Sequence, residues 1–279
     1  MIHVATVHYK SDKWIDVQVA YLARHLQEPY RVVASFEAID PVHEPKFDRV
    51  VQAVGGHAGK LNLLASLIVD QAEHDDLIMF LDGDAFPIAD PMPTVHKALD
   101  ESLLIAVRRD EVAGDKQPHP CFCVIRAEDW DRIRGDWSPG FPWKNTQGEL
   151  LSDAGGNLLG KLERIGAPWT PLLRSNTTNL HPLWFGVYGD VLYHHGAGFR
   201  DMVVPSALTR PPAWLNGTEK YRLLGSALRH ADATRVRVQN YRGMQASKRL
   251  SEEVYARLQS DPSFYEEFLA PRSTGAGSG

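Results

Sequence analysis

The 279-residue sequence has few of the features that mark secreted, membrane or zinc-binding proteins. It has 2 cysteines, Cys121 and Cys123, which are too close along the chain for a routine disulfide and too few for a zinc site. No apolar run is long enough to span a bilayer, and no charged leader precedes an apolar segment. We therefore expect a cytoplasmic protein without a transmembrane segment.

The sequence also lacks a strongly basic region. Its net charge is −5, which argues against nucleic acid as the principal partner. Arginines are frequent from Arg210 onward, but acidic residues lie between them, so a solvated face is favoured over an acidic partner or a lipid surface. A hydrophobic content of 43% is enough for a large core, either in one α/β domain with an appendage or in two domains.

Strand and helix patterns follow each other along most of the chain. Apolar runs predict strands at 2–7, 31–36, 47–51, 77–81, 103–107, 122–125 and 191–195. Helical spacing of apolar residues predicts helices at 14–25, 60–72, 93–99, 128–133, 153–165, 216–231 and 251–269. Such an alternation predicts an α/β fold with a mostly parallel sheet flanked by helices.

The most informative segment is Asp82-Gly83-Asp84, which follows the apolar run 77–81. Open α/β sheets bind their ligands at the carboxyl ends of the strands, where this segment is expected. Two carboxylates there would be costly without a partner, and a divalent cation such as Mn²⁺ or Mg²⁺ would provide one. The alternative is a surface turn in which Gly83 supplies an unusual dihedral and both aspartates are merely solvated.

Two further groups of polar residues lie near predicted element ends. In the segment 57–62, Lys60 and Asn62 sit at a turn that leads into a helix, where they could meet a base or a phosphate; an ordinary helix start is the alternative. Near the late strand, His194 and His195 precede a glycine-rich segment and Arg200, which could stabilise phosphate charge. Neighbouring residues of a strand face opposite sides, so one of the two histidines is expected to face the site and bind the metal.

The segment 134–147 is expected to be an aromatic loop. Trp137, Phe141 and Trp143 could form a platform for a sugar acceptor, although packing of one or two of them in the core is the equal alternative. Asp153 begins a predicted helix, and its ordinary interpretation is a helix N-cap.

In order and spacing, residues 1 to about 200 resemble the GT-A glycosyltransferases, the nucleotide-diphosphosugar transferases. The resemblance rests on the N-terminal strand, the Gly59–Asn62 turn, the Asp82-x-Asp84 motif, an Asp-containing helix start and a late His-x-x-Gly. It implies a GT-A domain over residues 1–205, with a helical extension at 206–271 and a disordered tail at 272–279.

The resemblance also implies site roles. Asp82 and Asp84 would hold Mn²⁺ or Mg²⁺, with His195 as the third ligand and His194 as its alternate. Thr6, Val7 and His8 would contact the nucleotide base, and Gly83, Lys60, Asn62 and Arg200 complete the expected nucleotide-sugar site. Asp153 would be the catalytic base of an inverting reaction.

The expected activity is transfer of a sugar from a nucleotide-diphosphate sugar, with a UDP-sugar favoured, to a hydroxyl of a glycan, a lipid-linked acceptor or a small molecule. Two departures leave the stereochemistry open: Ser152 stands where a glutamate is frequent, and Phe199-Arg200 replaces a Lys-Pro-Trp ending. The alternatives are a haloacid-dehalogenase-like phosphatase and a non-catalytic nucleotide-sugar-binding module. The oligomeric state is left open.

Overall fold

The computed structural model describes residues 1–112, 114–146, 148–177, 184–196, 245–246 and 248–269. The chain divides into two compact units, one formed by Met1–Phe199 with Tyr265–Gly279 and the other by Arg200–Phe264. The expected helix at 216–231 and the expected tail at 272–279 lie outside the described residues. The expected helix at 251–269 is interrupted: residues 248–260 are helical in the second unit, and α7 (Glu266–Leu269) belongs to the first.

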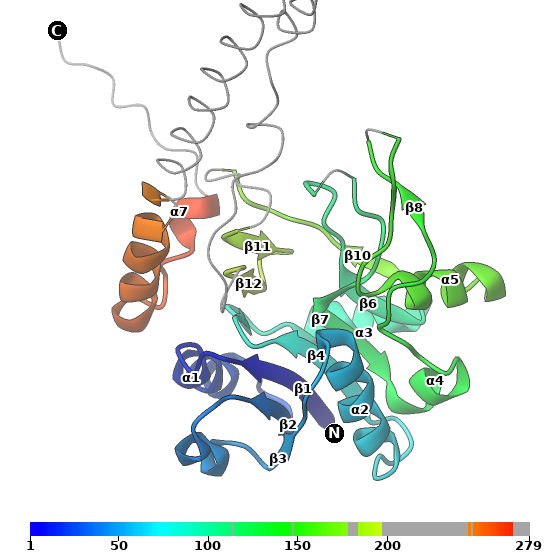
Figure 1. The fold of residues 1–279 in the computed structure, drawn as a ribbon, viewed down its shortest axis with the longest axis horizontal. Helices are drawn as coiled ribbons and strands as arrows, with labels where there is room; N and C mark the ends of the chain where they lie inside the picture. The colour runs from blue at the N-terminus through cyan, green and yellow to red at the C-terminus, as the bar shows by residue number, and fades with distance from the viewer. Residues whose placement is uncertain (113, 147, 178–183, 197–244, 247, 270–279) are drawn as a thin grey trace, which may run out of the picture. The chain divides into compact units, whose positions relative to one another are not determined.

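The first unit is built on a seven-stranded sheet with the order β10-β6-β7-β4-β1-β2-β3 (Figure 1). Its strands are β1 (Ile2–Tyr9), β2 (Tyr30–Glu37), β3 (Arg49–Gln52), β4 (Leu77–Asp82), β6 (Leu104–Val107), β7 (His119–Arg126) and β10 (Thr170–Leu172). Only β7 runs against its neighbours β4 and β6, while the other pairs are parallel. The prediction of a mostly parallel α/β sheet is therefore confirmed.

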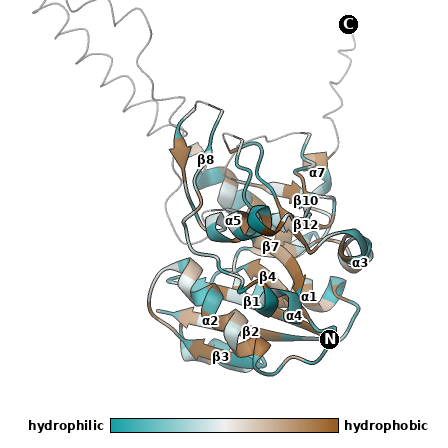
Figure 2. Ribbon diagram, turned by 90° about the vertical axis from the view of Figure 1, so that its right-hand side faces the viewer, coloured by the Kyte–Doolittle hydropathy of each residue, from teal (hydrophilic) through white to brown (hydrophobic). Residues whose placement is uncertain are grey.

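The central strands are apolar on both sides because helices cover both faces of the sheet. Consecutive residues of β4 alternate between two cores: Met79 and Leu81 enter one core, and Ile78 and Phe80 enter the other. Figure 2 shows hydrophobic residues along β7 and hydrophilic residues on covering helices such as α3 and α5. Each fully buried Leu, Ile or Phe contributes about 1.5–3 kcal/mol to folding, so these cores stabilise the edge that carries the aspartates.

Among the described residues of the first unit, five helices cover the two faces of the sheet. They are α1 (Ile15–His25), α2 (His57–Val69), α3 (Met92–Glu101), α4 (Ala127–Arg132) and α5 (Gly156–Ile165). Apolar residues of α1 and α3 join the first core, and those of α2, α4 and α5 join the second. Each follows its predicted helix within a few residues, since apolar spacing determines which face is buried.

Short elements complete the first unit. A three-stranded antiparallel sheet has the order β11-β12-β5, made of Gly186–Tyr188, Leu192–His194 and Ala85–Pro87. A two-stranded hairpin pairs β8 (Trp143–Lys144) with β9 (Leu150–Leu151), so the expected aromatic loop contains a strand. The 3₁₀ helix η1 (Pro41–Lys46) connects β2 to β3. No helix in the described part of the chain is both long and apolar enough to cross a membrane.

Candidate functional site

Two aspartates and one histidine converge at the carboxyl end of β4. Asp82 is the last residue of β4, and Asp84 lies in the turn before β5. Strand β12 pairs with β5 so that His194 lies opposite Ala85. His194 Nε2 is 3.4 Å from Asp84 Oδ1 and 3.7 Å from Asp82 Oδ2. One ligand atom from each of the three lies within 4.8 Å of the others, a grouping that could hold a metal ion.

The histidine that joins the aspartates is His194, the alternate in the sequence analysis, and not His195. The His195 ring is buried on the other side of the strand, 4.4 Å from Trp14 and 5.2 Å from Phe185. Its Nδ1 lies 3.0 Å from the Tyr193 hydroxyl, and burial lowers its pKa to about 3. The structure therefore brings His194, and not His195, to the two aspartates.

Asp84 and His194 each favour the charged form of the other. Burial opposes ionisation of Asp84, but the His194 imidazole lowers the Asp84 pKa to about 2. Burial likewise opposes a charge on His194, but Cys121 and Asp84 raise its pKa well above the usual range. A protonated His194 thus offsets the charge of one of the two carboxylates, and a metal ion would replace its proton because a ligating imidazole is neutral.

His57 is a further side chain of this site, and the sequence analysis gave it no role. It is the first residue of α2, and its Nε2 lies 2.9 Å from Asp82 Oδ1. Burial would lower the His57 pKa, but Asp82 raises it. The sequence signal for His57 is its position at the start of the segment 57–62, the segment that also contains Lys60 and Asn62.

The end of β1 lies against the aspartate turn. Val7 pairs with Asp82, and a Cβ on Gly83 would lie 2.6 Å from the Val7 carbonyl oxygen and 2.8 Å from His8 Nδ1. Only glycine permits this close approach. Thr6, Val7 and His8 are all buried there, and burial lowers the His8 pKa to about 4. Their expected contact with a nucleotide base remains a prediction.

Lys60 and Asn62 have partners within the protein. Lys60 is only 4% exposed; its Nζ lies 2.5 Å from Glu37 Oε2 and 4.6 Å from the centre of the Tyr9 ring. Asn62 donates to Asp136 Oδ1 at 2.7 Å and accepts from the Trp137 amide at 2.9 Å. Asn62 therefore fastens the loop after α4 to α2, and its role in nucleotide binding remains a prediction.

Asp153 lies before α5 and does not cap it. The helix begins at Gly156, and its N-cap is Gly155 in a left-handed conformation. The Asp153 side chain is 71% exposed, with one oxygen 3.9 Å from Arg109 Nη2. The alternative interpretation of Asp153 as an N-cap is wrong, because the helix starts three residues later.

Arg109 connects the Asp153 region to the rest of the site. It forms an ion pair with the buried Asp115 at 3.0 Å, and its charge helps to lower the pKa of His119, whose ring centre is 6.0 Å from that of His194. Burial is the larger cause of that lowered pKa. Arg109, Asp115 and His119 carry no signal in the sequence, since nothing in their spacing links them before the chain folds.

The aromatic residues proposed as an acceptor platform are mostly core residues. Trp137 is 0% exposed and packs on Phe80 and Trp130 in the core between the sheet and α4. Trp143 is also buried, whereas Phe141 is 37% exposed. Trp137 therefore packs in the core, as in the alternative interpretation, and presents no ring face to a ligand in this structure. Arg200 lies outside the described residues.

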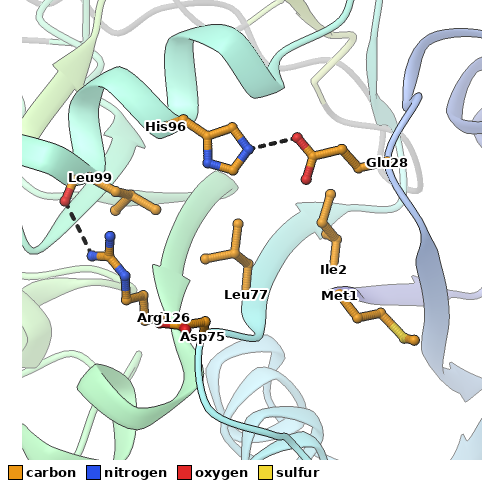
Figure 3. A pocket seen from close by; sticks show the side chains of 8 residues that line it. All are labelled: Met1, Ile2, Glu28, Asp75, Leu77, His96, Leu99 and Arg126. Carbon is orange, nitrogen blue, oxygen red and sulfur yellow. Dashed lines mark hydrogen bonds and ion pairs between the residues drawn. The ribbon is translucent and has the colours of Figure 1, made fainter.

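A cavity of about 190 Å³ lies at the amino ends of the central strands β1 and β4, away from the aspartates (Figure 3). Ile2 and Leu77, the first residues of β1 and β4, contribute to its lining. His96 Nε2 lies 2.6 Å from Glu28 Oε1, and Arg126 donates to the Leu99 carbonyl at 3.2 Å. This cavity is thus separated from Asp82 and Asp84 by the length of β4.

No family model matches the sequence, and no curated protein matches it either. The solved structures that resemble it include glycosyltransferases. TarS of S. aureus (residues 1–349) is 17% identical with a TM-score of 0.36, and the match covers 49% of this chain and 50% of that chain. GlyE of Streptococcus pneumoniae is 16% identical with a TM-score of 0.36, covering 47% of this chain and 36% of that chain.

A third similar structure is the mannosyltransferase PcManGT of Pyrobaculum calidifontis in complex with GDP-Man and Mn²⁺. It is 13% identical with a TM-score of 0.35, and the match covers 49% of this chain and 47% of that chain. The matched part thus spans half or less of the length of each of these three proteins.

Proposed function

We propose that the chain is a metal-dependent glycosyltransferase that moves a sugar from a nucleotide-diphosphate sugar, with a UDP-sugar favoured, to an acceptor hydroxyl. The observation that carries the proposal is the convergence of Asp82, Asp84 and His194 at the carboxyl end of β4. This is the edge of an open α/β sheet at which ligands bind.

The donor set fits Mn²⁺ or Mg²⁺. Two carboxylates supply the oxygen ligands that hard cations prefer, and the neutral imidazole of His194 would supply a third ligand. Three protein ligands leave positions open for the phosphates of a donor. When bound, such a cation would neutralise negative charge on the leaving diphosphate.

The chain's own residues would perform the remaining tasks. His57, at the amino end of α2, holds Asp82, and the positive end of the α2 dipole lies at the same carboxyl ends of the strands. Asp153 is exposed and loosely held by Arg109, which leaves its carboxylate available to take the proton of an acceptor hydroxyl as general base. Thr6, Val7 and His8 would border the base, and Lys60, Asn62, Gly83 and Arg200 would complete the donor site.

The test is a panel of UDP-, GDP-, CMP- and dTDP-sugars with the full-length protein, with and without Mn²⁺. Thermal stabilisation that requires both a nucleotide sugar and Mn²⁺ would support the proposal, because a ligand of the folded state raises Tm by mass action. Asp84→Asn and His194→Ala should abolish the Mn²⁺-dependent part, whereas His195→Ala should retain it in the folded fraction.

Product analysis separates the alternatives. Release of nucleoside diphosphate with transfer or hydrolysis of the sugar supports a glycosyltransferase. Metal-dependent binding without any turnover would identify a non-catalytic module. Release of inorganic phosphate from a phosphomonoester, abolished by Asp82→Asn, would instead identify a phosphatase.

A further inference from the structure

Gln18 on α1 holds both ends of the turn that carries the aspartates. Its side chain is in the second turn of the helix and is completely buried, with 0% of the residue exposed. Nε2 donates to the Asp82 carbonyl at 2.8 Å and to the Ala85 carbonyl at 2.9 Å. These two residues flank Gly83 and Asp84, so one amide group spans the whole Asp82–Ala85 turn.

The other end of the same amide is also engaged. Thr6 Oγ1 donates to Gln18 Oε1 at 3.1 Å from strand β1. The two carbonyls can only accept hydrogen bonds, so they take the amide N–H₂ group, and the amide oxygen is left to accept from Thr6. The network therefore joins α1, β1 and the β4–β5 connection through one side chain.

The Asp82–Ala85 turn needs hydrogen bonds from outside to hold its backbone in place. The carboxylates of Asp82 and Asp84 come close enough to share one ligand-sized space, and like charges at that distance repel each other. Gly83 cannot bear a side chain because of its contact with β1, so it supplies no contact of its own to stiffen the turn. The backbone on either side must then be held from outside.

We propose that Gln18 is a positioning residue of the cation site: by holding the Asp82 and Ala85 carbonyls from α1, it sets the directions of the Asp82 and Asp84 carboxylates. This inference rests on the proposed metal-dependent function. A merely structural Gln18 would satisfy two buried carbonyls and affect stability alone. A positioning Gln18 affects cation affinity as well.

The experiment measures Mn²⁺ affinity by electron paramagnetic resonance at a temperature well below the Tm of each variant. Gln18→Glu keeps the shape and removes both donors, and Gln18→Met keeps the length without polar atoms. Loss of a group that orients metal ligands costs about 10–100-fold in metal affinity, so both variants should bind Mn²⁺ at least about 10-fold more weakly. Asn157→Ala is the control, because that side-chain amide bonds Asp136 away from the turn and its loss should leave Mn²⁺ affinity unchanged.

Each outcome gives a decision. Folded Gln18 variants with wild-type Mn²⁺ affinity overturn the inference and leave the proposed function standing. If the wild-type protein binds no Mn²⁺, both are overturned. If Gln18→Glu and Gln18→Met do not fold, Gln18→Asn replaces them, because its shorter side chain cannot reach both carbonyls. Weaker Mn²⁺ binding by Gln18→Asn, with wild-type Mn²⁺ affinity in Asn157→Ala, then supports the inference.

Discussion

The side-chain amide of Asn62 donates to the carboxylate of Asp136 across 2.7 Å, which fastens the loop after α4 to helix α2. Asn157 of α5 donates to the other oxygen of Asp136 at 2.8 Å, and the Ser138 amide donates to the first at 2.9 Å. One carboxylate thus joins two helices and the loop that carries Trp137. Burial opposes ionisation of Asp136, but these hydrogen bonds lower its pKa from 3.8 to about 2.

Asp136→Asn should therefore lower stability at neutral pH. Because the folded-state pKa is below the unfolded one, Asp136 stabilises the protein above about pH 4 and loses this effect as the pH falls toward 2. After allowance for solvent screening, the loss at pH 7 is about 1 kcal/mol. Urea unfolding at pH 7 and between pH 4 and 2 would measure it. The exposed Asp131→Asn is the control, and an Asp136→Asn variant with the pH slope of the wild type would contradict the prediction.

Gly83→Ala should destabilise the protein and weaken Mn²⁺ binding together. The added carbon would lie 2.6 Å from the Val7 carbonyl oxygen, so β1 or the aspartate turn must move. Overpacking of this kind costs about 1–3 kcal/mol. Gly59→Ala is a matched control: Gly59 is inside α2 with nothing within 4 Å of the added carbon, and alanine there should gain about 0.5–1 kcal/mol. Equal unfolding free energies for the two variants would refute the steric argument.

Lys60→Met tests whether the buried Lys60 only pairs with Glu37 or also contacts the donor. Lys60 lowers the pKa of Glu37, and its removal leaves that carboxylate beside an apolar side chain. The single variant should melt at a lower temperature than the double variant Lys60→Met with Glu37→Gln, because the second change removes the charge that Lys60 had paired. If Lys60 also contacts the donor, the double variant will regain its Tm without regaining nucleotide-sugar affinity. A double variant with wild-type affinity would remove Lys60 from the donor site.

Asp153→Asn should lower turnover by about 10²–10⁴-fold with donor affinity nearly unchanged, as expected for loss of a general base. Stability should remain at the wild-type level, since the Asp153 side chain is exposed and α5 is capped by Gly155. Single-turnover rates and the donor Kd would measure this. The exposed Asp100→Asn serves as the control, and a wild-type rate in Asp153→Asn would exclude it as the base.

The sequence by itself determined the sheet, its covering helices and the position of the two aspartates. These follow from local information: an apolar run of strand length is buried whichever strands lie beside it, and a polar turn must follow it at the surface. The predicted strand at 77–81 is accordingly β4, and Asp82 ends it. The short strands β5, β10 and β11 escaped prediction because three residues carry no period.

Only the tertiary structure decided which side chains meet at the end of β4. His194 and His195 are neighbours of the same type. Which of them faces the aspartates depends on the pairing of β12 with β5, which lies more than a hundred residues earlier in the chain. The proline- and glycine-rich sequence around Trp137 is typical of a surface loop. In the structure, Asn62 accepts from the Trp137 amide and Asp136 accepts from the Ser138 amide, and with the backbone held in this way the Trp137 ring packs in the core. Gln18 and Arg109 have no local signal, because a hydrogen bond or ion pair between distant segments exists only once packing has brought them together.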